Sequence, residues 1–132
     1  MSILGRRISA RVIALVVALM LVGAWLSAVA RTPDREIVLV AKDMSFYLES
    51  DPTTANPTIE VKAGERIRIV LRNADRGMTH DFAFPAISAG LEQIDWNETG
   101  DVTFDVPETP GIYEYVCRPH RFMMRGSIIV RQ

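Results

Sequence analysis

Side chains that bind soft metal ions crowd together near the C-terminus of this 132-residue sequence. Cys117 and His120 are separated by two residues, and Met123 and Met124 follow shortly after. Thiolate and thioether sulfurs favour copper, and imidazole suits copper as well. A second imidazole would have to come from His80, because the chain has only 2 histidines and 1 cysteine. Two imidazoles and a thiolate with a weak axial thioether form the ligand set of a copper site that transfers electrons.

The elements that must position these residues are predicted to be strands. Residues 65–73 and 101–106 alternate apolar and polar side chains with a period of two, which is typical of strands buried on one face. Short turn-forming segments separate the runs and favour an all-β antiparallel sandwich as a single domain, residues 31–132. Further runs rich in β-branched or aromatic residues are 36–41, 58–62, 81–84, 112–117 and 127–131.

One stretch of this domain, residues 85–97, has no clear strand pattern. Its apolar positions Ile87, Leu91 and Ile94 fit a short amphipathic helix as well as a loop. Both interpretations stay open from the sequence.

The first 30 residues are predicted to be an export signal or a membrane anchor helix. Arginines precede an uncharged apolar run over residues 12–30, in the order of a signal peptide. Small residues at 28–30 fit signal cleavage, whereas the run approaches the roughly 20 residues of a spanning helix, so both alternatives stay open. In either case the domain is expected in a periplasmic or other extracytoplasmic location, touching a membrane only through residues 12–30 if these stay uncleaved.

Charge and residue counts exclude several classes of function. A formal net charge of -1 provides no broad basic surface for nucleic acid. The two histidines leave none for a second copper cluster, and the single cysteine cannot form a binuclear thiolate-bridged centre. No hydrolase motif is present. The sequence therefore predicts a protein that is not an enzyme.

The residues around the cysteine resemble the cupredoxin family of small type 1 blue copper proteins, which includes plastocyanins, amicyanins and azurins. The resemblance rests on residues 61–65, on the turn at 73–80 and above all on 110–117, which ends in Tyr-Val-Cys. It implies a Greek-key β-sandwich with one Cu(I)/Cu(II) ion bound at one end. By that resemblance the metal ligands are His80, Cys117, His120 and one methionine.

The resemblance leaves two candidates for the axial methionine. The spacing from His120 to Met124, followed by Arg125 and Gly126, looks like the ending of azurin, whereas amicyanin-like spacing selects Met123. We predict Met124, because Gly126 would set the start of the last strand and keep Met124 in register. Met123 is the alternative axial ligand.

Simpler interpretations compete with the copper site. A lone cysteine or histidine is more often structural, and methionines often fill gaps in a core. Zinc also binds cysteine and histidine, but methionine is not among its usual ligands. Because both histidines, the single cysteine and a methionine occupy positions that the resemblance requires, we interpret them as one copper site.

The sequence departs from the common family pattern at Asp81, where the family often has asparagine. A carboxylate there could accept backbone N–H groups or pair with Arg118 or Arg76, and would still support the neighbouring ligands. Pro119 has no N–H and so cannot donate a hydrogen bond to the Cys117 sulfur.

The predicted function is a mononuclear type 1 copper protein that shuttles single electrons between redox partners outside the cytoplasm. The resemblance implies that His120 lies near the surface, where it would pass the electron. Arg118, Arg121, Phe122 and Arg125 surround it in the sequence and would dock an acidic redox partner. As an alternative to docking, these arginines are ordinary solvated residues or pair with Asp81 and Asp75. Alternative functions are a copper-trafficking protein and an interaction module without metal on the same scaffold. The domain is expected to be monomeric.

Overall fold

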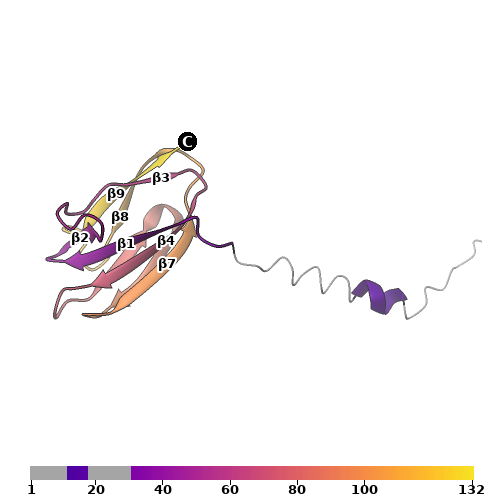
Figure 1. Ribbon diagram of the computed structural model, residues 1–132, viewed down its shortest axis with the longest axis horizontal. Helices are drawn as coiled ribbons and strands as arrows, with labels where there is room; N and C mark the ends of the chain where they lie inside the picture. The colour runs from indigo at the N-terminus through magenta and orange to yellow at the C-terminus, as the bar shows by residue number, and fades with distance from the viewer. Residues whose placement is uncertain (1–11, 18–30) are drawn as a thin grey trace, which may run out of the picture. The chain divides into compact units, whose positions relative to one another are not determined.

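Strands dominate the part of the chain that the computed structural model describes, residues 12–17 and 31–132. Within Pro33–Gln132 they form two sheets, with strand orders β2-β1-β4-β7 and β3-β9-β8-β5-β6. Figure 1 shows β1, β4 and β7 side by side in one layer, with β3, β8 and β9 in the other. The prediction of an all-β sandwich is confirmed. The bounds are β1 Arg35–Lys42, β2 Ser45–Leu48, β3 Ile59–Lys62, β4 Arg66–Asn73, β5 His80–Phe84, η1 Pro85–Ile87, β6 Ala89–Ile94, β7 Thr99–Asp105, β8 Gly111–Val116 and β9 Arg125–Arg131.

The period of two in β4 and β7 builds the core between the layers. Ile67, Ile69 and Leu71 are fully buried, while Arg66, Arg68 and Arg72 lie on the outer face of the sheet. There Arg68 bonds both Glu36 and Asp101 at 3.0 Å, so charge covers the face that meets water. Burial of the alternate side chains is the main stabilisation of such a two-layer fold.

Two strand pairs are parallel, so the prediction of a wholly antiparallel sandwich is wrong for them. β1 pairs in parallel with β4, and β3 pairs in parallel with β9. Neither pair is consecutive in the chain: β2 and β3 separate β1 from β4, and the chain crosses to the other sheet between them. Parallel neighbours need such a long crossover connection, which alternation of side chains along a single strand does not reveal.

The hairpin between β1 and β2 was not predicted from the sequence. Lys42 pairs with Ser45, so only Asp43 and Met44 form the turn, and both have positive φ, 49° and 58°. Such a two-residue turn usually carries Asn-Gly or Asp-Gly. The carboxylate of Asp75 replaces that signal, because it accepts the N–H of Asp43 at 2.7 Å and of Met44 at 3.1 Å.

Residues 85–97 contain the strand Ala89–Ile94, where both interpretations made from the sequence are wrong. A 3-10 turn, Pro85–Ile87, leads through Ser88 at φ 54° into β6, which pairs antiparallel with β5. β6 is an edge strand, and Leu91 is its buried side chain. One buried residue in six gives little alternation, so pairing with β5 decides the conformation.

The N-terminal prediction falls largely outside the described residues. Residues 12–17 are helical, and residues 18–30 are not described. No helix within the described ranges is long and apolar enough to cross a membrane. The export signal or anchor, and the domain boundary after residue 30, stay predictions.

Candidate metal centre

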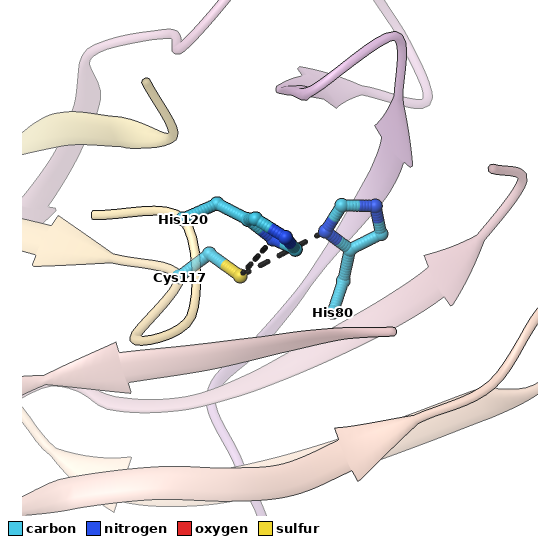
Figure 2. A group of neighbouring side chains, drawn as sticks. All are labelled: His80, Cys117 and His120. Carbon is cyan, nitrogen blue, oxygen red and sulfur yellow. Dashed lines mark hydrogen bonds between the residues drawn. The ribbon is translucent and has the colours of Figure 1, made fainter. Parts of the chain in front are cut away.

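Three side chains from distant parts of the sequence meet at one end of the sandwich. His80 is the first residue of β5, Cys117 follows the last residue of β8, and His120 lies in the turn between β8 and β9. The Cys117 Sγ lies 3.8 Å from Nδ1 of His80 and 3.6 Å from Nδ1 of His120. Figure 2 shows both rings turned toward the sulfur. The three donor atoms all lie within 4.8 Å of one another, as the sequence predicted.

The spacing of these donors suits a shared metal ion. The nitrogen–sulfur distances of 3.8 and 3.6 Å are long enough for one ion to lie between the two atoms of each pair. Metal–nitrogen bonds of about 2.0 Å and metal–sulfur bonds of about 2.3 Å, set about 120° apart, would separate nitrogen from sulfur by about 3.7 Å. The two imidazoles and the thiol therefore fit a trigonal His₂Cys site.

His80 is oriented by a carboxylate that the sequence analysis did not assign to this role. Its Nε2 lies 3.0 Å from the Oδ2 of Asp75, so an N–H there can donate to the carboxylate and leave Nδ1 free for a metal. Burial is the largest cause of a lowered pKa at His80, although the adjacent Asp75 raises it, and the lowered pKa favours a neutral ring at pH 7. Asp75 lies in the turn between β4 and β5, which leads directly to His80. That position could have indicated its role, because metal-binding histidines commonly bond a carboxylate.

Asp75 also joins this histidine to the β1–β2 turn. Its oxygens accept the backbone N–H groups of Asp43 and Met44 as well as bonding the His80 ring. Although burial alone would raise the pKa of Asp75, these partners together hold it below its ordinary value. One ionised carboxylate therefore orders a ligand and a hairpin at the same end of the molecule.

Cys117 is fully buried, and its sulfur accepts the backbone N–H of Asp81 at 3.5 Å. Burial raises the pKa of the thiol to about 11, despite the N–H that lowers it. Without a metal the sulfur therefore stays protonated at neutral pH. A metal ion must displace that proton, because the thiolate is the ligand.

Hydrogen bonds fold the segment from Cys117 to Met124 into a closed turn. The N–H of Cys117 donates to the Met124 carbonyl at 2.9 Å, and the N–H of Met124 donates to the His120 carbonyl at 2.8 Å. The side-chain amide of Asn56 donates to the Met123 carbonyl at 2.9 Å and ties this turn to the loop before β3. The ligand spacing in the sequence is thus converted into a rigid loop.

The two candidate axial methionines differ in burial. Met124 is 0% exposed and belongs to the core, whereas Met123 is 59% exposed. A weak axial ligand must lie inside the protein beside the buried cysteine, so burial favours Met124. Its carbonyl already bonds the Cys117 N–H, which keeps it close to that ligand.

The surrounding residues named from the sequence lie in different environments. Arg118 bonds Asp81 through its Nε at 2.7 Å, and Arg125 lies 4.0 Å from Glu114. Arg121 is exposed, and Phe122 is 88% exposed. His120 is half-buried, as expected for a ligand with one ring edge near solvent. Pairing with an acidic neighbour thus holds for Arg118 and, at longer range, for Arg125.

The sequence model described as cupredoxin-like domain matches residues 12–130. The chain belongs to the cupredoxin family. A curated cupredoxin relative, amicyanin-alpha of Methylorubrum extorquens, is 30% identical over 76 residues, which cover 56% of this chain and 60% of the relative's length.

Solved cupredoxin structures share the fold. Auracyanin B superposes with a TM-score of 0.63 at 20% identity, covering 79% of this chain and 94% of its own. Auracyanin A of Chloroflexus aurantiacus superposes with a TM-score of 0.59 at 21% identity, and the match covers 73% of this chain and 98% of auracyanin A. Reduced rusticyanin superposes with a TM-score of 0.57 at 22% identity, and the match covers 86% of this chain and 96% of rusticyanin. At these identities the likeness establishes the cupredoxin fold, and the site must be argued from the residues of this chain.

Those residues fit one copper ion. A thiolate, two imidazoles and a buried thioether are the donor types that copper prefers in a trigonal site with a weak axial ligand. The two nearby carboxylates are used by the protein itself, Asp75 by His80 and Asp81 by Arg118. The donor set is therefore rich in sulfur and nitrogen, unlike the oxygen-rich sites of magnesium or calcium.

Proposed function

We propose that this protein binds one type 1 copper ion through His80, Cys117 and His120, with Met124 as axial ligand, and carries single electrons between redox proteins. The observation that carries the proposal is the convergence of the three donor atoms within 4.8 Å. The match to a relative named amicyanin-alpha supports it, as does the fold shared with auracyanin A, described as a "blue" copper protein.

The surroundings of the ligands support electron transfer over catalysis. Copper, when bound, supplies a one-electron change between Cu(II) and Cu(I). The hydrogen bonds of Asp75 and of the Cys117–Met124 turn hold the ligands in one arrangement, which limits the movement that must accompany each change. Three strong ligands and a buried thioether leave no open position for a substrate, unlike a catalytic metal site.

Exposed apolar side chains at the same end of the sandwich support a docking role. Phe122 and Met123 lie in the ligand loop beside His120, while Met78 and Trp96 lie in the two turns that Asn73 joins by its amide. Partners that meet briefly often use a small apolar centre with charges at its rim. We propose Phe122 as the centre of this docking surface, with Arg118, Arg121 and Arg125 at its rim and an acidic redox protein as partner.

The N-terminal segment supplies the location in this proposal. An apolar run that follows arginines would deliver residues 31–132 outside the cytoplasm, either released after cleavage or anchored. Copper is a stronger competitor than zinc for nitrogen and sulfur ligands, so an exported site of this type would take copper where it is available.

Titration of the purified protein with Cu(II) tests the function. We expect one equivalent to produce an intense blue thiolate-to-copper absorption and reversible one-electron voltammetry. Cys117→Ser should abolish the blue absorption, because the thiolate is its source. A colourless Cu(I) complex that exchanges readily would instead indicate copper trafficking, and absence of copper binding would contradict the proposal altogether.

A further inference from the structure

A buried carboxylate connects the two segments that carry the ligands. Asp81 is 1% exposed and follows His80 in β5. Its Oδ1 accepts the backbone N–H of Arg118 at 2.7 Å, and its Oδ2 accepts the Nε of the same residue at 2.7 Å. Both carboxylate oxygens are thus bonded by one residue, which directly follows Cys117.

The arginine is fixed at its other end as well. Its Nη2 donates to the Leu91 carbonyl on β6 at 2.7 Å. Charge-assisted hydrogen bonds of this length are among the stronger polar contacts in proteins. Arg118 therefore spans from the ligand loop across β5 to the edge strand, with its guanidinium directed at Asp81 as well as toward solvent.

The residue that carries the buried carboxylate also contacts the thiol ligand. The backbone N–H of Asp81 donates to the Cys117 sulfur at 3.5 Å. The carboxylate of Asp81 therefore belongs to a residue in direct contact with that sulfur. A negative charge here stabilises the more positive Cu(II) state, and a positive charge opposes it. Screening by solvent is weak for a carboxylate with almost no exposure.

We propose that the opposite charges of Asp81 and Arg118, paired at 2.7 Å beside the Cys117 loop, set the reduction potential of the site. The inference rests on the proposed copper function. It assigns Arg118 a role in balancing charge in addition to its place at the docking rim, and it assigns the charge of Asp81, rather than its hydrogen bonds alone, an effect on the metal.

Opposite charges make opposite predictions for the two single variants. Asp81→Asn removes the negative charge and leaves Arg118, so the reduction potential should rise. Arg118→Gln leaves the buried carboxylate unbalanced, so the potential should fall. The double variant should lie nearer the unmodified protein than either single variant. A tether without an electrostatic effect would loosen the same loop in both cases and would not produce shifts of opposite sign.

Voltammetry of the copper-loaded full chain at neutral pH measures these shifts, with Arg125→Gln as the matched control. Arg125 begins β9 directly after the ligand loop, but its partner Glu114 is 4.0 Å away and exposed, so its removal should shift the potential less than removal of Arg118. Shifts of the same sign in both single variants, or an equal shift in the control, would overturn the proposal. If Asp81→Asn fails to load copper, the comparison of Arg118→Gln with Arg125→Gln decides alone.

Unfolding of the metal-free full chain supplies a readout that does not depend on copper. Arg118→Gln should lower the denaturation midpoint of the unmodified protein more than that of the Asp81→Asn protein, because only the former contains the ion pair. An equal decrease of the midpoint in both proteins would show that Asp81 and Arg118 do not form a stabilising ion pair. If the unmodified protein binds no copper, the proposed function fails, and this comparison still decides whether the pair exists.

Discussion

At the scale of single residues, adjacent methionines have opposite surroundings. Asn56 holds the Met123 carbonyl, and the Met123 side chain points outward while that of Met124 enters the core. Spacing in the sequence allowed either to be the axial ligand, because the two differ by one position. The backbone bonds of the folded loop decide which thioether reaches the interior.

Replacement of each methionine by leucine tests this assignment. Met124→Leu should raise the reduction potential by on the order of 60 mV, a tenfold change in the one-electron equilibrium, because Cu(II) loses more than Cu(I) when a donor is removed. Met123→Leu should leave the potential and the visible spectrum unchanged. Voltammetry and absorption spectra of the two loaded variants measure the difference. Equal effects, or an effect confined to Met123→Leu, would contradict the assignment.

The buried thiol of Cys117 has a consequence for pH dependence. Burial raises its pKa to about 11 from 9.0. As the pH rises, the thiol therefore ionises at a lower pH in the unfolded chain than in the folded protein. The free energy of unfolding of the metal-free protein should therefore be unaffected by this group below pH 9 and should decline between about pH 9 and pH 11.

The ultraviolet absorption of the thiolate follows this titration directly. In the folded metal-free protein we expect a midpoint near pH 11, and alkylation by iodoacetamide about a hundredfold slower near neutral pH than in urea-unfolded protein, as two pKa units imply. A folded protein that titrates like its unfolded form would show that the thiol is not buried as described.

At the scale of elements, the pairing of β8 with β9 depends on a missing side chain. Gly126 lies opposite Tyr115 in the register, and a Cβ at this glycine would come within 2.4 Å of the Tyr115 ring. The ring is fully buried, and its hydroxyl donates to the Pro57 carbonyl at 2.7 Å. The tyrosine therefore cannot move aside without loss of both packing and a hydrogen bond.

Gly126→Ala should consequently destabilise the metal-free protein by about 1–3 kcal/mol through overpacking. Gly111→Ala is the matched control on the same strand pair, because its Cβ would meet the Tyr113 ring at 3.5 Å, an ordinary contact. Denaturant unfolding measures both. Similar losses of stability in the two variants would show that contact with Tyr115 is not the cause.

Elements with strong alternation were predictable, and those that depend on a neighbour were not. β4 was predicted because alternate isoleucines and arginines require one dry and one wet face. β2 has only four residues, and its turn is supported by Asp75 from another loop. β6 depends on pairing with β5. Contacts between distant segments leave no periodic signal in the short segment itself.

At the scale of the whole molecule, acidic residues outnumber basic ones in residues 31–132, yet Arg121 lies directly beside the half-buried His120. Arg131, at the far end of β9 from the ligand loop, pairs with Glu60 at 2.9 Å. Arg121 thus adds a positive charge beside His120 in a domain whose net charge is negative. The rate of association with a charged reagent should therefore depend on whether a charge is altered at the metal end or at the opposite end.

Electron transfer with anionic hexacyanoferrate tests this polarity. Arg121→Glu should slow the second-order rate about two- to tenfold at low ionic strength, with a smaller effect at high salt, because local charge steers encounters. Arg131→Glu makes the same change in net charge at the opposite end and should have a weaker effect. Stopped-flow rates measure both variants. Equal slowing would indicate that only net charge matters and that His120 is not the port.

Residue identity and periodicity determined most of the metal site and the sandwich. With two histidines and one cysteine in the chain, any site built from these ligands has to use His80, Cys117 and His120, and alternation alone required sheets with one buried face. The tertiary structure decided which methionine is buried, which carboxylate orients His80 and where Arg118 directs its charge. Those outcomes depend on hydrogen bonds between segments far apart in the chain, and spacing along a sequence carries no distance information across such gaps.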